Sequence, residues 1–333
     1  MSAELWRPTS GCGPACLPAR APAVPVARRL ARLAGVLGML LAGAGLAAPL
    51  ALLPAAERAA VVRAWARGTA RALGVRLEVH GRPPRRRALL VANHVSWLDV
   101  LAILAVAPAR LLAKREVRAW PLVGLLARAG GAFFVDRSRP RDLPVTVARL
   151  AGALRAGHPV AVFPEGTTWC GTAAPAACRP GRGFRPAVFQ AAIDAGAPVV
   201  PLRLEYRSAV TGEVTTAAAF LGEENLWQSV RRVLAGRDLV LAVRVTAALH
   251  PARDADRRLL ARAAEAAVHL VPARPVPPPA VRARPHAAPV PPRAVPAPPP
   301  AGPAGAVAVR PAFGAPSSVT SGVPGAGETD LAA

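Results

Sequence analysis

The residues of this sequence best suited to catalysis are a histidine and an aspartate that follow an apolar run. Residues 88–92 are apolar, Asn93-His94 come next, and Asp99 lies five residues beyond the histidine. A histidine can take a proton from a hydroxyl group, and a nearby carboxylate can hold the imidazole in the required tautomer. A purely structural histidine is the alternative, because six histidines give several chances for such a spacing.

The spacing restricts where this pair can lie. Five residues along a helix rotate a side chain by about 500°, which leaves the two side chains about 140° apart. His94 must therefore lie in the turn before a helix if it is to meet Asp99. Ser96 followed by Asp99 is typical of a capping box, which predicts Ser96 as the N-cap and Asp99 as the third helical residue. A carboxylate in a first turn also stabilises a helix without catalysis.

Two more motifs follow apolar runs downstream. Residues 131–137 read GAFFVDR, and residues 163–168 read FPEGTT. An arginine just after a strand can bind a phosphate through two parallel hydrogen bonds, which suggests this role for Arg137. A surface arginine is the alternative. Proline and glycine on either side of Glu165 predict a tight turn that presents the glutamate and backbone N–H groups.

These motifs are set in a pattern of alternating strands and helices. The pattern indicates an α/β fold, with a central mixed, mostly parallel sheet flanked by helices. Short apolar runs predict strands at 75–79, 88–92, 110–113, 132–135, 159–163, 199–204 and 239–245. Helices are expected at 96–105, 122–129, 143–156, 185–195 and 253–270.

Together, the three motifs resemble those of the glycerolipid acyltransferases, also called lysophospholipid or 1-acylglycerol-3-phosphate acyltransferases. The resemblance covers residues 73–248 and rests on the order and spacing of the motifs. It implies that His94 is a general base that deprotonates an acceptor hydroxyl, and that Asp99 orients it. The hydroxylate would then attack an acyl thioester, with no metal, no cofactor and no acyl-enzyme.

The resemblance also implies a set of acceptor-binding residues. Arg137 matches the family arginine that binds the acceptor phosphate, and the turn around Glu165 contributes to the same site. Asn93 is included with them, although we expect it to fix the geometry of its turn. The expected substrate-binding residues are Arg137, Glu165, Gly166, Thr167, Lys114 and Asn93.

Thr168 departs from the family pattern. Many members specific for acylglycerol phosphate have an arginine at this position. The threonine removes one expected phosphate ligand, so other lyso-lipids, such as a lyso-ornithine-type lipid, remain open as acceptors.

The net charge of +23 is compatible with several anionic partners. We expect no nucleic-acid binding, because the arginines are spread along the chain and aromatic residues make up only 4% of it. An anionic membrane surface or an anionic substrate suits the charge better. Cysteines occur at positions 12, 16, 170 and 178. Neither pair has the two-residue spacing of zinc knuckles and no histidine is near, so we expect free thiols in a reducing compartment and no metal.

Residues 33–53 carry no charge and would extend about 30 Å as a helix, the thickness of a bilayer core. This predicts a membrane anchor, spanning or re-entrant; a buried helix of a soluble protein is the alternative. Both flanks are basic, so the charges do not choose an orientation, although a re-entrant segment with both flanks in the cytoplasm would satisfy them.

A basic helix is expected at 57–73. Arg63, Arg67 and Arg71 form one stripe, and Trp65 lies on an apolar face. Such a helix either lies on an anionic bilayer with Trp65 at the interface or packs on the domain.

The sequence thus predicts four regions: a disordered basic N-terminus (1–28), an anchor with the basic helix (29–73), an acyltransferase domain (74–270) and a disordered Pro/Ala-rich tail (271–333). The expected function is transfer of a fatty acyl group from acyl-CoA or an acyl carrier protein to a lyso-lipid such as 1-acylglycerol-3-phosphate, in phospholipid biosynthesis. The expected location is the inner membrane, with the active site facing the cytoplasm. The alternatives are a different acceptor and a non-catalytic membrane adaptor.

Overall fold

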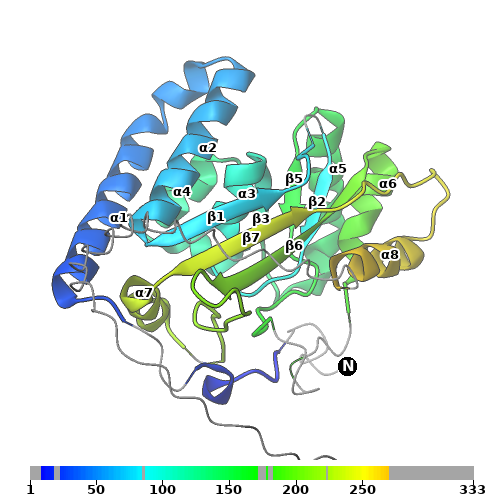
Figure 1. Cartoon of the computed structure of the whole chain (residues 1–333). Coiled ribbons are helices and arrows are strands. Elements are labelled where there is room, and N and C mark those ends of the chain that lie inside the picture. The colour runs from blue at the N-terminus through cyan, green and yellow to red at the C-terminus, as the bar shows by residue number, and fades with distance from the viewer. Residues whose placement is uncertain are drawn as a thin grey trace, which may run out of the picture. The chain divides into compact units, whose positions relative to one another are not determined.

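Seven strands form one sheet in the order β1-β7-β6-β2-β5-β3-β4 (Figure 1). The computed structural model describes residues 9–18, 23–84, 87–171, 178, 183–222 and 224–269. The tail expected at 271–333 lies outside them. The strands are β1 Val75–His80, β2 Leu89–Ala92, β3 Arg110–Lys114, β4 Phe133–Val135, β5 Val160–Val162, β6 Val199–Ser208 and β7 Leu239–Val245.

The sheet is mixed and mostly parallel, which confirms the predicted fold class. β2 pairs in parallel with β5 and β6, and β3 pairs in parallel with β5 and β4. The direction reverses between β6 and β7, and β1 runs parallel to β7 at the edge. The carboxyl ends of β2, β3, β4 and β5 therefore lie along one edge of the sheet, where ligands of open α/β sheets bind.

Helices cover both faces of the sheet. Leu89 and Val91 of β2 belong to a core with α5, α6 and α8, whereas Leu90 and Ala92 belong to a second core with α3 and α7. A strand buried on both faces is a continuous apolar run, which is why the sequence located it. The helices are α1 Val26–Leu46, α2 Ala55–Ala72, α3 Asp99–Val106, α4 Val123–Ala129, α5 Leu143–Arg155, α6 Gln190–Ala195, α7 Leu226–Ala235 and α8 Arg257–His269. Short 3₁₀ helices are η2 Pro14–Cys16, η3 Pro49–Leu52, η4 Arg115–Ala119, η5 Pro140–Asp142 and η7 Pro186–Phe189.

Helices α1 and α2 form a hairpin connected through η3 (Figure 1). Trp65 Nε1 of α2 donates to the carbonyl oxygen of Met39 in α1 at 2.7 Å. A Cβ at Gly43 would lie 2.7 Å from Trp65 Nε1, so the close approach requires glycine there. Trp65 therefore faces α1. Helix α2 packs on α1 and α3, as the alternative for it proposed, and its contact with an anionic bilayer stays a prediction.

Part of the N-terminus expected to be disordered (1–28) is ordered. Cys12 and Val24 are buried, and α1 begins at Val26, before the uncharged segment. Arg32 explains this early start, because it donates from Nη1 to the carbonyl oxygens of Leu234 at 2.9 Å and Gly236 at 2.7 Å. These carbonyls lie at the C-terminal end of α7, which favours a cation.

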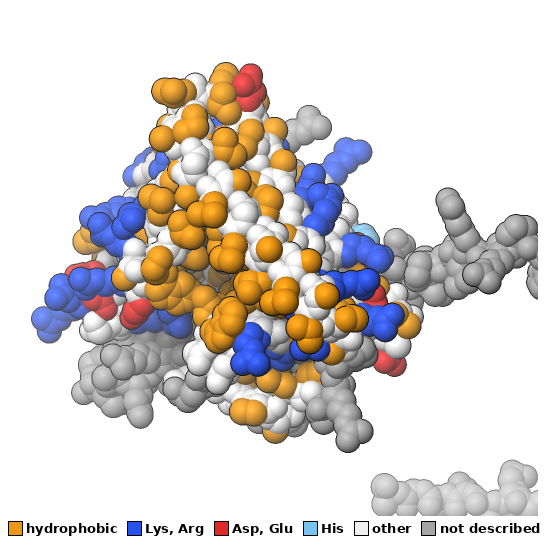
Figure 2. All heavy atoms as spheres, turned by 90° about the vertical axis from the view of Figure 1, so that its left-hand side faces the viewer, with side chains coloured by type: hydrophobic (Ala, Val, Ile, Leu, Met, Phe, Trp, Pro, Cys, Tyr) orange, Lys and Arg blue, Asp and Glu red, His pale blue; other side chains and the backbone are white. Residues whose placement is uncertain are grey.

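The outer side of α1 is apolar and exposed. Leu30 and Leu41 are each 61% exposed, and Val26 and Leu37 lie on the same helical face. Figure 2 shows apolar side chains gathered on this side of the molecule, with basic side chains toward its margins. Within the described part of the chain, α1 is the helix long and apolar enough to cross a membrane.

Candidate active site

His94 and Asp99 meet just beyond the C-terminal end of β2. His94 Nδ1 lies 2.9 Å from Asp99 Oδ2, and the same oxygen accepts from the backbone N–H groups of Val95 at 2.7 Å and Ser96 at 2.9 Å. Asp99 is completely buried. His94 lies in the turn before the helix, as its spacing requires. The helix begins at Asp99 itself, so the predicted capping box is wrong in register. The carboxylate reaches back to the turn, and the Ser96 side chain accepts from the Leu98 N–H at 3.4 Å.

Tyr206 is a further hydrogen-bond partner of Asp99, and it was not identified as a site residue from the sequence. Its hydroxyl donates to Asp99 Oδ1 at 2.6 Å. Burial and the negative charge of Asp99 raise the pKa of Tyr206 well above its usual value, so it remains a neutral donor. Tyr206 is the only tyrosine of the chain, and it lies two residues beyond the predicted end of its strand.

The other contacts of His94 hold its ring and backbone in place. The ring stacks on Phe163 with 3.9 Å between centroids and 11° between planes. The backbone N–H donates to Glu165 Oε2 at 2.7 Å, and the carbonyl oxygen accepts from Trp169 N at 2.8 Å. The first and third motifs are therefore joined directly. Since Asp99 binds Nδ1, Nε2 is the nitrogen left to exchange a proton with a ligand.

Glu165 is buried, which corrects the expectation that its turn presents it to the acceptor. Only 5% of the residue is exposed, and its second oxygen lies 3.3 Å from His269 Nε2. Burial raises the pKa of Glu165, an effect that His269 and the His94 N–H oppose. The tight turn itself is present: Gly166 has φ +77°, and its N–H donates to Phe163 O at 3.0 Å. Glu165 thus braces the His94 backbone.

Asn93 also has a positioning role rather than the substrate-binding role in which it was grouped. Its Nδ2 donates to Leu204 O at 2.9 Å, and its Oδ1 accepts from Leu204 N at 2.8 Å. The side chain imitates a strand residue and fastens the end of β2 to β6. Both amide atoms are engaged, the residue is buried, and it does not line the cavity that contains His94.

Three cations line the cavity that His94 also lines. Arg137, Lys114 and Arg185 line the same cavity. Burial and the Arg185 charge lower the pKa of Arg137, and burial and the Arg137 charge lower that of Lys114. None of the described residues forms a hydrogen bond or ion pair with Arg137. The Glu116 charge opposes both shifts. A half-buried guanidinium that forms no salt bridge with a described residue and lies beside like charges favours an anionic ligand.

The carboxylate of Asp136, the neighbour of Arg137, binds Ser138 and Arg115 rather than Arg137. Hydrogen bonds from Ser138 and then Arg115 lower the pKa of Asp136 to about 2. Its Oδ2 lies 2.7 Å from Arg115 Nη1. The aspartate therefore remains charged and ties the end of β4 to η4 without neutralising Arg137.

One cavity of about 1840 Å³ joins these groups. His94, Thr167 and the three cations line it together with other charged residues such as Arg63 and Glu116, and apolar residues of α1, α2 and α3 also line it, among them Leu40, Val62, Leu101 and Leu104. Thr168 also borders the cavity, but its hydroxyl donates to the carbonyl oxygen of Phe220. The cavity can hold a molecule with an anionic head and a long apolar chain, beside a general base.

Comparisons with known proteins agree with this geometry. Residues 76–205 match the family model described as Acyltransferase. The chain is 36% identical over 250 residues to a lyso-ornithine lipid O-acyltransferase of Pseudomonas aeruginosa, covering 73% of this chain and 93% of that protein. It is 32% identical over 221 residues to a 1-acyl-sn-glycerol-3-phosphate acyltransferase of Neisseria gonorrhoeae, covering 66% of this chain and 82% of that protein. The chain has the same fold as the 1-acyl-sn-glycerophosphate acyltransferase of Thermotoga maritima in its crystal structure. The TM-score is 0.54 at 18% identity, and the match covers 73% of this chain and 92% of that chain.

Proposed function

The chain belongs to the acyltransferase family, acting on lyso-lipids, and on this premise we propose that it transfers a fatty acyl group from an acyl thioester to the hydroxyl of 1-acylglycerol-3-phosphate. The observation that carries the proposal is the shared cavity, in which His94 faces the same space as Arg137 and Lys114.

The proposed reaction uses His94 as a shuttle for one proton. Nε2 removes the proton of the acceptor hydroxyl while its oxygen attacks the thioester carbonyl carbon. The tetrahedral oxyanion collapses, the carbon–sulfur bond breaks, and the leaving thiolate takes the proton back from the imidazolium. Asp99 stabilises the imidazolium through Nδ1 and preserves the tautomer. The products are the diacyl lipid and the free thiol of CoA or of an acyl carrier protein.

The three cations support a phosphate acceptor. A phosphate monoester carries up to two negative charges, and an arginine can bind it through two parallel hydrogen bonds. Arg137 forms no salt bridge with a described residue, and the Glu116 charge opposes the lowering of its pKa only in part, so a phosphate would replace its lost hydration. Thr167 and the turn at Gly166 border the same cavity, and its apolar lining suits the acyl chains.

A second candidate acceptor is a lyso-ornithine lipid. Two observations favour it. The Thr168 hydroxyl donates to the carbonyl oxygen of Phe220 and is therefore not available to a phosphate. The similar protein of P. aeruginosa, 93% of whose length aligns with this chain, is named a lyso-ornithine lipid O-acyltransferase. The carboxylate of such a lipid would bind the same cations, because it too accepts two hydrogen bonds from a guanidinium.

An acceptor panel tests the proposal. The full chain, purified in detergent, is given acyl-CoA or acyl carrier protein with 1-acylglycerol-3-phosphate, lyso-ornithine lipid or lysophosphatidylcholine. We expect transfer to the first acceptor, and a loss of at least about 10²-fold for His94→Ala at an unchanged melting temperature. His158→Ala is the matched control, because His158 lines the same cavity and has no role in the proposed reaction. Faster transfer to the ornithine lipid selects the second candidate; no transfer to any acceptor favours a non-catalytic adaptor.

A further inference from the structure

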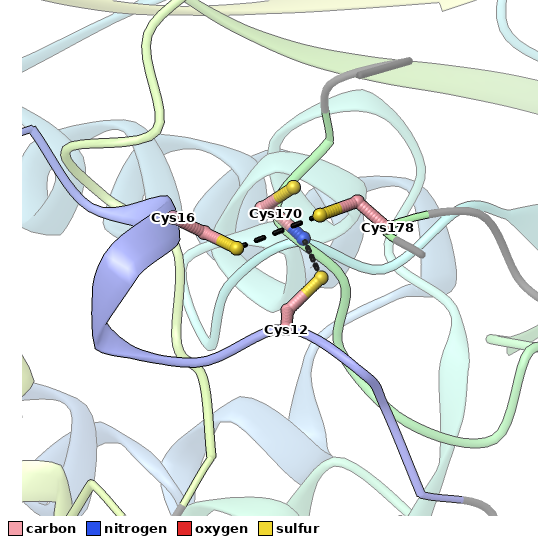
Figure 3. A group of neighbouring side chains, drawn as sticks. All are labelled: Cys12, Cys16, Cys170 and Cys178. Atoms are coloured by element: carbon pink, nitrogen blue, oxygen red, sulfur yellow. Dashed lines mark hydrogen bonds between the residues drawn. The ribbon is translucent and has the colours of Figure 1, made fainter. Parts of the chain in front are cut away.

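All four cysteines of the chain gather at one point of the structure (Figure 3). Their Sγ atoms all lie within 4.8 Å of one another, although one pair comes from the N-terminal segment and the other from positions 170 and 178. Cys16 Sγ lies 3.5 Å from Cys178 Sγ. Cys12, Cys170 and Cys178 are buried, Cys16 is partly buried, and none of the four forms a disulfide.

The backbone around the cluster is shaped to direct these sulfurs together. The 3₁₀ turn η2 closes with Cys16 N donating to Gly13 O at 2.9 Å, which folds Cys16 back toward Cys12. Cys170 N donates to Cys12 Sγ at 3.4 Å. Backbone N–H groups that donate to sulfur stabilise a thiolate and orient it as a ligand.

We propose that Cys12, Cys16, Cys170 and Cys178 bind one zinc ion in a closed, tetrahedral structural site. Zinc–sulfur bonds of about 2.3 Å place the four sulfurs of such a site about 3.8 Å apart, close to the spacing present here. An iron–sulfur cluster would hold its ligands farther apart, because irons and sulfides lie between them. Binding would convert four thiols to thiolates and release four protons, since only the thiolate ligates the metal.

The proposal replaces the expectation, drawn from the sequence, that the cysteines bind no metal. That expectation required two residues between the members of a pair. The three residues between Cys12 and Cys16 also lie within the range of structural zinc sites. The approach of the second pair depends on the fold and has no local signal.

The zinc ion would fasten the N-terminal segment to the loop that supports the active site. Cys170 follows Trp169, whose N–H bonds the carbonyl oxygen of His94, and Gly171 lies against Val95. The four cysteines do not line the cavity described above. The site is therefore expected to position the catalytic turn without touching substrate.

Metal content and thiol counting on the wild-type chain test the proposal together. The chain is purified without chelator or added metal, and zinc is measured by inductively coupled plasma mass spectrometry. A second sample is denatured with chelator but without reductant and labelled with iodoacetamide. We expect one zinc per chain and four labelled cysteines. Four labels without zinc would show ordinary thiols, and no labels would show two disulfides; either result overturns the proposal.

Variants then locate the ion. Cys16→Ala is expected to reduce zinc to background, whereas Cys16→His, which keeps a ligand, is expected to retain it. Ser10→Ala is the matched control, because Ser10 Oγ accepts from Cys12 N at 3.1 Å but offers no thiolate. Undiminished zinc in Cys16→Ala would overturn the four-cysteine assignment. If that variant fails to fold, cobalt substituted into the wild-type chain gives the same decision: the visible absorption of tetrahedral cobalt thiolate supports the site, and its absence refutes it.

Discussion

At the scale of single residues, the two oxygens of Asp99 have different partners. Oδ2 accepts from His94 Nδ1 and from two backbone N–H groups, whereas Oδ1 accepts from Tyr206. Asp99 is therefore held from both sides before any substrate binds. The orientation of His94 then depends on a carboxylate that cannot rotate.

Tyr206→Phe is expected to lower kcat roughly tenfold and to leave the KM of both substrates within about twofold. The change removes one hydrogen bond to a charged group, worth about 1.5–3 kcal/mol, while Oδ2 still holds His94. Steady-state kinetics and thermal melts of the purified variant measure this. Asp99→Asn is the comparison: it should lower kcat by about 10⁴-fold, because an amide favours the wrong imidazole tautomer. A Tyr206→Phe defect confined to KM would contradict the positioning role.

Several residues of the recognised motifs support the site rather than contact a ligand. Asn93 and Glu165 are buried. Both amide atoms of Asn93 bond the Leu204 backbone, whereas Glu165 accepts from the His94 N–H with one oxygen and lies beside the His269 side chain with the other. The sequence indicates that such polar residues follow apolar runs. It cannot show whether their side chains point into the cavity or into the protein, because that depends on which backbone groups the fold leaves unpaired.

At the scale of secondary structure elements, β4 and η4 together place Arg137. Asp136 at the end of β4 binds Arg115 of η4 and the N–H group of Ser138, so the backbone on both sides of Arg137 is fixed. The Arg137 guanidinium then lines the cavity.

Arg137→Lys is expected to raise the acceptor KM by about ten- to a hundredfold and to change the thioester KM by less than about twofold. Lysine keeps the charge but loses the paired hydrogen bonds of a guanidinium, each worth about 1.5–3 kcal/mol. Arg139→Lys is the matched control, since Arg139 is exposed and lies 3.9 Å from Asp136. Initial rates with each substrate varied in turn measure the two constants. Equal effects on both substrates would refute acceptor binding by Arg137.

The elements that the sequence located are those with a local apolar signal. All seven strands coincide with apolar runs, because buried parallel strands have apolar side chains on both faces. β6 extends past its predicted end to Ser208, because Arg203 and Arg207 pair with Glu205 inside the strand and interrupt its apolar run. Tyr206 was missed for the same reason.

Helix α7 was missed, although its signal was present. Asn225 and Gln228 form a capping box at its start, with Gln228 N donating to Asn225 Oδ1 at 2.9 Å. The helix has only ten residues, but Leu226, Val230, Val233 and Leu234 recur at helical spacing, so its amphipathic pattern was a second signal. The cysteine cluster had no local signal, because its halves lie more than 150 residues apart in the sequence.

At the scale of the whole molecule, both ends of the α1–α2 hairpin are attached to the same sheet and helices. Val24 N donates to Ala235 O at 2.9 Å before α1, and Val75 pairs with Leu239 after α2. A single crossing of the bilayer would separate these two attachments. We therefore favour a hairpin that lies along one membrane surface, with the apolar side of α1 immersed and the arginines of α2 near the head groups. This arrangement places the basic flanks of α1 and the active site on the same side of the membrane, which agrees with the expected cytoplasmic location of the active site.

A triple variant of α1 tests this arrangement. Leu30→Gln, Leu37→Gln and Leu41→Gln together should weaken binding to vesicles containing anionic lipid by at least about tenfold per leucine, because each buried side chain contributes about 1.5–3 kcal/mol. Flotation of the purified chain with vesicles measures the binding. The control is the triple change of Val145, Val210 and Leu259 to glutamine, exposed apolar residues elsewhere on the surface. Equal losses in both triple variants would exclude α1 as the membrane-contacting element.

The pairing of the first and last strands also sets the order of events during synthesis. Arg32 precedes its partner Gly236 by 204 residues, and β1 pairs with β7, the last strand to be made. At about 5–20 residues per second, roughly 10–40 s pass between the emergence of α1 from the ribosome and that of the residues that dock it. Throughout this interval, the membrane surface favoured above for α1 is an apolar surface on which the helix can bury its exposed leucines. Helix α1 is then expected to reach the membrane while the polypeptide is still growing, and the remaining strands assemble around a helix that is already anchored.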